Sequence, residues 1–525
     1  MPREEEGLAI RGDVRWRTGA LSVVLLSLAL RLVNLAGPSL RGDEAFTVTF
    51  SRQPLPDVWR TLLLTEPHPP LYYTIMHAWM SAAGQSELGV RFVSVLFGVL
   101  LTALTYRLGR ALLGDEAAAP RDEPSGQALI AALLVAVNPY LVWQSQDARM
   151  YTLLAAACAA QLLLATVIWQ RQETRRSRGF HLWVGYVAVS LIALYSHYGA
   201  VFALLAVNLA WLLGLGRSQS LTPAVWKHPA VRSWLVAQVV VVLCYLPWML
   251  AAAPMLLGHT KGWIAPVGLG TLLERSLITY SLGTTSGAAA PSLAAGFLAV
   301  AAVGVWQGVR ASAGRAVTVL AYLLAPLLIG FGISLRRPMF DERYFLFIIP
   351  AYAVLLGWGL GSLARDAAHG GRPARTGLTL AVLAGSLWIL GASAYSLGNA
   401  YFAPEYAKSP GWRELVQYII SSASPGDVVI QNYPDPTLSY YLDNRLPLQV
   451  IPSTGPLQPA LADRQLENAL ATSRRIWFLP YDSPGWDEDS YVENWLKQRA
   501  RAVSDETIGQ IRLVCYDVQA SPTGN

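Results

Sequence analysis

The chain has 525 residues, of which 53% are hydrophobic and only 14% are charged, whereas about 25% of residues carry a charge in soluble domains. This composition excludes a soluble enzyme. Basic residues outnumber acidic ones by 40 to 34, and the excess lies in residues 1–397, which hold 30 basic and 19 acidic side chains. Membrane topology explains this excess better than nucleic-acid binding does, so no nucleic-acid partner is expected. The three cysteines lie far apart and predict neither a disulfide framework nor a cysteine zinc site.

Apolar runs long enough to cross a membrane begin close to the start of the chain. The first, at about residues 18–36, follows three arginines but lacks the small-residue cleavage site of a signal peptide, so we expect a retained helix. A helix needs about 20 residues to cross about 30 Å of hydrocarbon, and further runs meet that length. They lie near residues 90–113, 127–144, 150–170, 180–196, 198–216, 232–253, 287–309, 317–335, 344–364 and 375–397. The sequence therefore predicts an α-helical polytopic membrane protein with about eleven transmembrane helices.

One apolar segment, residues 69–84, is short for a span, because its length as a helix is only about 24 Å at 1.5 Å per residue. If it does not cross, the basic loop at residues 171–178 faces the cytoplasm, as the positive-inside rule requires. If it crossed, every later loop would change sides. We therefore expect a juxtamembrane or re-entrant helix here, in a cell-membrane protein whose C-terminal domain is outside.

The two parts of the chain differ in pattern, and we expect a transmembrane domain at residues 1–397 and a soluble domain at residues 398–525. In the second part, strand-like runs alternate with helical stretches, which is typical of a small α/β domain. The strands are expected at 427–433, 474–481 and 511–518, and the helices around 410–422, 459–472 and 488–501. The sequence shows no GxGxxG motif, P-loop or Asp-x-Asp motif that would hold a nucleotide, so no nucleotide site is indicated.

With this topology, polar residues close to the apolar runs collect on the external side. Charges near hydrocarbon are costly unless they are paired or hydrated, so their convergence on one face suggests a cavity. The group consists of Asp43, Glu44, Glu66, His68, Asp147, Arg149, His197, Tyr198, Lys261, Trp263, Arg336, Arg337, Asp341, Glu342 and Arg343.

Each of these residues also has a simpler explanation. Asp43 and Glu44 suit the first turn of an ordinary loop helix, where acids are favoured. His197 at a helix junction is more often a satisfied polar residue than a ligand or a base. Asp147 and Arg149 are close enough in sequence to pair with each other. The combination on one external face is stronger support for a site than any single residue.

Five segments recur in the same order in a known family: LRGDEAFT, EPHPPLYY, NPYLVWQSQDARMYTL, SHYGAVFALL and DERYFLFIIPAYAVLL. Over about residues 15–400 the chain resembles the bacterial membrane glycosyltransferases of the protein O-mannosyltransferase and aminoarabinose-transferase type, which have the C-type glycosyltransferase fold. The resemblance implies an external active site, a polyprenyl-phosphate-linked sugar donor, and a protein, lipid or glycan acceptor outside the cytoplasm. It gives no sign of which sugar is moved.

The resemblance also implies roles for individual residues. Asp43, with Glu44 beside it, corresponds to the acid taken as the catalytic base. Arg149 and Arg343 correspond to groups that face the lipid phosphate, and Lys261 has a looser counterpart among them. Further substrate contacts are expected from His68, Asp147, His197 and Tyr198. A divalent metal is possible, but the sequence offers no clear second acid besides Asp147 to hold one.

This chemistry needs few groups, because a sugar joined to a lipid phosphate already carries a good leaving group. A carboxylate at Asp43 would accept the proton of the acceptor hydroxyl, and forked arginines would stabilise the departing phosphate. Direct attack inverts the anomeric centre. Glu44 is a poor second nucleophile, because adjacent helical side chains do not face one another. A secondary transporter of a polar or anionic solute is the alternative, although internal repeats and interrupted midplane helices are not evident.

Overall fold

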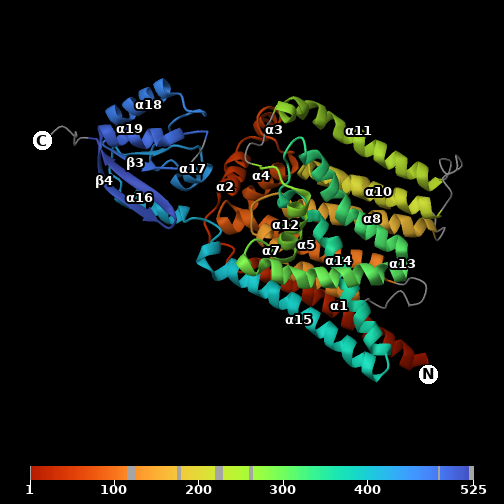
Figure 1. Cartoon of the computed structure of the whole chain (residues 1–525). Helices are drawn as coiled ribbons and strands as arrows, with labels where there is room; N and C mark the ends of the chain where they lie inside the picture. Colours follow the sequence, from red (N-terminus) through yellow and green to blue (C-terminus); the bar gives the residue numbers. More distant parts are fainter. Residues whose placement is uncertain are drawn as a thin grey trace. The chain divides into compact units, whose positions relative to one another are not determined.

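The computed structural model describes residues 2–114, 126–173, 179–218, 229–258, 264–482 and 485–518. The chain forms two compact units (Figure 1). Unit 1 comprises Met1–Leu35 and Gln53–Tyr406, and unit 2 comprises Ala36–Arg52 and Ala407–Asn525. A short segment near the N-terminus is therefore part of the same unit as the C-terminal domain. The boundary expected between residues 397 and 398 falls within the last long helix of unit 1.

Unit 1 is helical (Figure 1). Its α-helices are α1 (Pro2–Leu32), α3 (Leu55–Leu64), α4 (Leu71–Ala83), α5 (Glu87–Leu113), α6 (Gly126–Val137), α7 (Pro139–Ser145), α8 (Tyr151–Glu173), α9 (Phe180–Ser196), α10 (Ala200–Ser218), α11 (Pro229–Gly258), α12 (Leu269–Leu282), α13 (Ala290–Ser334), α14 (Ile349–His369) and α15 (Arg372–Phe402). Short 3-10 helices occur at η2 (Gly287–Ala289), η3 (Glu342–Tyr344), η4 (Leu346–Ile348) and η5 (Pro404–Tyr406).

Within the described ranges, six of these helices are long and apolar enough to cross a membrane, namely α5, α8, α11, α13, α14 and α15. The pair α6 and α7, bent by 55°, qualifies as a seventh span, and α9 and α10 are shorter apolar helices. The expected fold class is confirmed, since the chain is a mostly helical integral membrane protein with a small C-terminal sheet. The number of spans, predicted as about eleven, stays a prediction.

Two local features explain how the predicted apolar runs become separate helices. α13 has 45 residues, but Ser312 has the extended angles φ −161° and ψ 99°, which divide it into two parts of about the length that crosses a membrane. These parts correspond to the runs expected at 287–309 and 317–335. Asn138 separates α6 from α7, because its side-chain oxygen accepts a hydrogen bond from the Leu141 amide at 2.9 Å and caps α7.

α14 lies at the centre of the helix packing, because nearly all residues of its apolar part are buried. Glycines allow its neighbours to approach closely. A Cβ atom at Gly359 would lie 2.6 Å from the Val300 carbonyl oxygen of α13, nearer than real Cβ atoms come to other atoms. Small residues at helix interfaces are a usual means of packing membrane helices, because they let backbones meet.

Unit 2 is an α/β domain, as expected. Its elements are α2 (Gly42–Ser51), α16 (Trp412–Ser422), β1 (Val428–Gln431), α17 (Pro436–Leu442), β2 (Leu448–Val450), α18 (Pro459–Thr472), β3 (Arg475–Leu479), η6 (Glu488–Ser490), α19 (Tyr491–Arg499), β4 (Arg501–Ile508) and β5 (Ile511–Asp517). The five-stranded sheet has the order β2-β1-β3-β5-β4. Strand β1 is parallel to β2 and β3, whereas β5 is antiparallel to β3 and β4.

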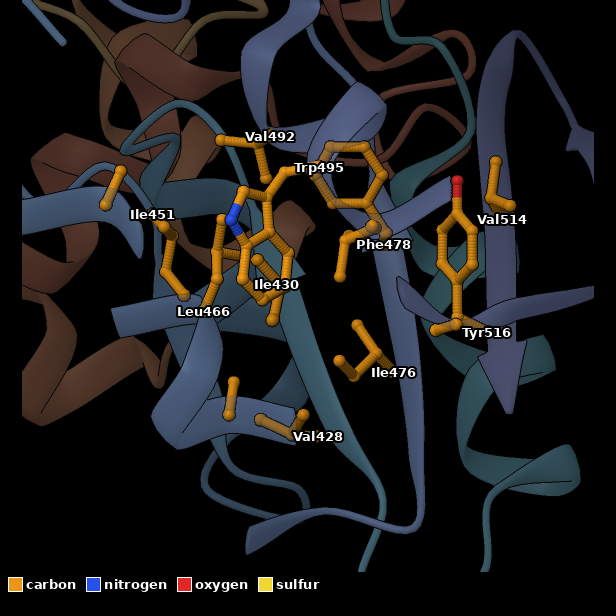
Figure 2. Close-up of a cluster of buried hydrophobic side chains, with 14 residues drawn as sticks. Val428, Ile430, Ile451, Leu466, Ile476, Phe478, Val492, Trp495, Val514 and Tyr516 are labelled. Carbon is orange, nitrogen blue, oxygen red and sulfur yellow. The ribbon is translucent and has the colours of Figure 1, made fainter. Parts of the chain in front are cut away.

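The sheet has a hydrophobic core on each face, because alternate residues of a strand point to opposite sides. On one face, Ile430, Ile476 and Phe478 pack with residues of α18 and α19, as Figure 2 shows. On the other face, Val429 and Trp477 pack with residues of α16 and α17. Helices therefore cover both faces of the central strands (Figure 1).

Candidate functional site

The structure brings Arg149 and Arg343 together around one aromatic ring. The guanidinium carbon of Arg149 lies 6.0 Å from the centre of the Tyr151 ring, and that of Arg343 lies 5.8 Å from the same centre. Cations are attracted to the faces of aromatic rings at such distances. Tyr151 begins α8 and Arg149 lies two residues before it, so the segment between α7 and α8 places these two residues, whereas Arg343 comes from η3. We call Arg149, Tyr151 and Arg343 the arginine cluster.

Arg149 is buried, at 4% exposure, and contacts on several sides hold it. Its carbonyl oxygen accepts a hydrogen bond from Ser94 Oγ at 3.1 Å. Its Nη2 lies 3.3 Å from His68 Nε2, and its Nη1 lies 3.5 Å from the Tyr73 hydroxyl. A guanidinium has only donors, so this contact requires His68 to accept at Nε2 and to carry its proton on Nδ1.

Arg343 is oriented by an acid two residues before it. Its Nε donates to Asp341 Oδ1 at 3.0 Å and its Nη2 donates to Oδ2 at 2.9 Å, forming a two-pronged ion pair. Asp341 Oδ1 also accepts the Arg343 amide at 2.9 Å, which caps η3. This arrangement fixes the plane of the guanidinium, as forked arginine pairs do.

The neighbouring acid, Glu342, pairs with Arg275 of α12 at 2.7 Å and 3.0 Å. The sequence analysis missed Arg275, although an arginine in an otherwise mostly apolar helix was the available signal. The two acids of the DER segment are thus engaged by two arginines. These pairs leave the segment rigid beside the cluster.

His197 adjoins the arginine cluster through two rings. Its ring centre lies 6.0 Å from that of Tyr151 and 4.9 Å from that of Tyr344. Its Nδ1 accepts the Gly199 amide at 2.9 Å, so a neutral His197 carries its proton on Nε2. Tyr198, expected beside it as a substrate contact, accepts a hydrogen bond from Trp248 Nε1 at 3.3 Å.

The remaining predicted residues of unit 1 are placed as follows. Asp147 is buried at 1% exposure, and its carbonyl oxygen accepts the Arg149 amide at 2.8 Å. Lys261 and Trp263 lie outside the described residues. Glu66, for which the sequence suggested no specific role, is half-buried, and burial raises the pKa of its carboxyl while the charge of Arg149 opposes that shift. Glu66 therefore adds a carboxyl group to the surroundings of Arg149.

Asp43 and Glu44 lie in unit 2, in the first turn of α2. Glu44 is fully buried, and its Oε2 accepts a hydrogen bond from the Arg41 amide at 3.1 Å, which caps the helix. Asp43 is exposed. The two neighbouring carboxylates thus have different surroundings, as expected for adjacent residues on a helix.

Within unit 2, α2 and the residues that flank it pack on α17 through a small set of contacts. The Leu40 amide donates to the Tyr441 hydroxyl at 2.7 Å, and Arg52 lies over the Tyr440 ring at 5.4 Å. A Cβ atom at Gly42 would lie 3.5 Å from the Asp435 carboxylate. The helix that bears Asp43 is therefore anchored at both ends to α17.

Among the described residues, no three His, Cys, Asp or Glu side chains are grouped as a metal site would need. The arginine cluster is instead suited to an anion, because forked cations with neutral histidines around them match the oxygens of a phosphate.

No protein-family model and no curated protein matches the chain. Solved structures do match the chain, and among them are two of ArnT, an aminoarabinose transferase, from Cupriavidus metallidurans. The apo structure has a TM-score of 0.62 and 15% sequence identity, covering 98% of this chain and 99% of that one. The structure bound to undecaprenyl phosphate has a TM-score of 0.61 and 15% identity, covering 96% and 99%. The chain therefore has the ArnT-like fold, which confirms the fold that the sequence resemblance implied.

Proposed function

We propose that the chain is a membrane glycosyltransferase that moves a sugar from a polyprenyl-phosphate donor to a hydroxyl group of an acceptor outside the cytoplasm. The observation that carries the proposal is the arginine cluster, in which two guanidinium groups share the Tyr151 ring. The fold supports it, because the similar ArnT was solved with undecaprenyl phosphate bound. The acceptor is a protein, a lipid or a glycan.

The arginine cluster would bind the donor phosphate. When the bond between the sugar and the phosphate oxygen breaks, negative charge grows on the phosphate, and positioned cations lower the energy of that state. Asp341 holds the Arg343 guanidinium in plane, and the Arg149 guanidinium lies against His68 and the Tyr73 hydroxyl, so little reorganisation is needed. His68 and His197 would complete the surroundings of the phosphate with neutral polar groups.

Asp43 would act as the general base. The acceptor oxygen attacks the anomeric carbon, its proton passes to the Asp43 carboxylate, and the lipid phosphate leaves with the bonding electrons. A single displacement of this kind inverts the anomeric centre. The exposure of Asp43 suits this role, whereas Glu44 is occupied with capping α2. Asp147, Tyr198 and Lys261 are further candidates for substrate contacts.

Transfer assays and uptake assays separate this function from transport. Purified protein in proteoliposomes receives a radiolabelled polyprenyl-phosphate sugar together with an envelope extract as the source of acceptors. We expect label in acceptor material and no accumulation of free sugar inside the vesicles. Vesicle uptake of solute without transfer would show that the chain is a secondary transporter.

A further inference from the structure

Unit 2 has an open hollow between α18 and α19 that the proposed catalytic chemistry does not use. Its volume is about 280 Å³, close to the lower end of ligand pockets. α18 contributes Asp463, η6 contributes Asp489, and α19 contributes the other lining residues, among them Asn494 and Gln498. The hollow therefore lies within one compact unit, and three of its helices line it.

Hydrogen bonds hold the carboxylate walls of the hollow in place. The Tyr491 hydroxyl donates to Asp463 Oδ1 at 2.6 Å, and the Asn494 side-chain amide donates to the Asp489 carbonyl oxygen at 2.9 Å. Asp489 and Ser490 have φ of 55° and 53°, in the left-handed region that non-glycine residues rarely adopt.

Aromatic side chains and a cation complete the lining. Trp495 is buried at 5% exposure, with its ring in the hydrophobic core beside Ile430 and Leu466 (Figure 2), yet it also borders the hollow. The Arg499 guanidinium lies 4.3 Å from the centre of a Trp495 ring. The hollow thus has a cationic rim, in which the Arg499 guanidinium lies over the buried Trp495 ring.

We propose that this hollow binds a saccharide. Its lining offers two carboxylates, two carboxamides and a guanidinium, which together both accept and donate hydrogen bonds. Sugar hydroxyls also both donate and accept hydrogen bonds. The volume fits a ligand of monosaccharide size.

The same residues argue against a cationic ligand. Asp463 already accepts the Tyr491 hydroxyl, and the charge of Arg499 offsets one of the two carboxylates. A divalent ion would also need more acid ligands than the hollow provides. A neutral polyhydroxyl compound therefore matches the site better than an amine or a metal ion. The interpretation of this saccharide as part of the acceptor rests on the proposed transferase function.

Saturation-transfer NMR on the full-length protein in nanodiscs tests the site with methyl glycosides of glucose, galactose, mannose and N-acetylglucosamine as probes. We expect saturable binding of at least one glycoside, weakened about 10-fold or more in Gln498→Ala and in Asp489→Asn, as loss of one or two hydrogen bonds predicts. Gln498 is exposed, so its replacement leaves folding intact, and Asn tolerates the left-handed conformation of Asp489. Glu467→Ala, exposed on α18 outside the hollow, is the matched control and should bind as the unmodified protein does.

Three results would overturn the proposal: no binding of any glycoside, binding that both hollow variants retain in full, or binding of methylamine or Ca²⁺ at the hollow in place of sugars. Sugar transfer is measured separately on the same preparations. Glycoside binding without transfer would count against the transferase function alone, and transfer without glycoside binding would count against the saccharide site alone.

Discussion

Tyr151 explains how two arginines that are far apart in sequence come to lie at the same place in the fold. Its ring provides a shared surface for two guanidinium groups that would otherwise repel each other. A bound phosphate would offset that repulsion further. The sequence analysis predicted the two arginines as phosphate ligands but did not identify Tyr151 as their shared contact, because nothing in a sequence shows which ring lies between two cations.

Arg149→Lys and Arg343→Lys should each raise the KM for the lipid-phosphate donor by about 10-fold or more. The charge is kept, but the planar guanidinium with its five N–H donors is lost, and a hydrogen bond to a charged group is worth about 1.5–3 kcal/mol. Arg60→Lys, exposed on α3, is the control. Donor kinetics that match the unmodified enzyme in both cluster variants would remove these residues from the phosphate site.

Asp43→Asn should leave a folded protein that binds donor but transfers sugar at least about 100-fold more slowly, the lower range for loss of a general base. Asn keeps the shape and suits the first helical turn, so a purely structural Asp43 would predict nearly full activity. Glu44→Gln should have a milder effect, because Gln can still accept from the Arg41 amide. The rate is measured with saturating donor, and full activity of Asp43→Asn would exclude Asp43 as the base.

The contribution of Glu66 to the stability of the folded protein should depend on pH. Burial raises the pKa of its carboxyl above the usual 4.5, with Arg149 opposing the shift. A raised folded-state pKa stabilises the fold below the unfolded pKa, and this contribution is lost as the pH rises through the raised value. The melting temperature should therefore show a decrease above pH 4.5 that Glu66→Gln lacks and that Glu274→Gln, exposed on α12, retains. The same pH profile in Glu66→Gln and the unmodified protein would contradict this assignment.

At the scale of elements, helices with long apolar runs could be predicted, and so could the strands β1, β3 and β5. The sequence analysis missed β2 and β4. β2 has only three residues, and β4 is a largely exposed edge strand whose polar sequence shows no apolar alternation. Its pairing with β5, rather than its own composition, makes it a strand.

The contact of α13 with α14 depends on a glycine, and a methyl group there should be costly. In Gly359→Ala the new Cβ would meet the Val300 carbonyl oxygen at 2.6 Å, so the helices must separate. We expect a loss of about 1–3 kcal/mol, the usual cost of overpacking. Gly332→Ala on α13 is the matched control, because a Cβ there meets nothing within 4 Å. Thermal unfolding in detergent measures both, and equal melting temperatures would show that the contact tolerates a side chain.

At the scale of the whole molecule, topology is the main prediction from sequence. α4 has 13 residues, or about 20 Å of helix, which is short for a span. If α4 does not cross, Gly179 is cytoplasmic and unit 2 is external. In a background without native cysteines, an impermeant thiol reagent applied to intact cells should label Cys at Gln510 but not at Gly179. Labelling of the cysteine at position 179 from outside would contradict the predicted topology.

Sequence reasoning could not assign residues 36–52 to the C-terminal unit. The helix there is ten residues long, and its partner α17 is distant in the chain. No local sequence pattern therefore indicates that the two helices are in contact. The arginines and acids of the site could be found because charged residues next to apolar runs are conspicuous. Their partners, such as Arg275 and Tyr151, depend on contacts between helices, and these contacts require coordinates.

The assignment of α2 to unit 2 also has a consequence for biosynthesis. A ten-residue helix is marginal alone, and α2 has to wait for α17, which starts almost 400 residues later, at Pro436. At ribosomal rates of 5–20 residues per second, the delay is about 20–80 s. During that interval the nascent protein already contains the long apolar helices of unit 1, but the helix that bears Asp43 lacks its support. Under the role proposed for Asp43, catalytic competence would thus arrive only after α17 has been made, and a chain terminated before α17 would insert in the membrane without becoming active.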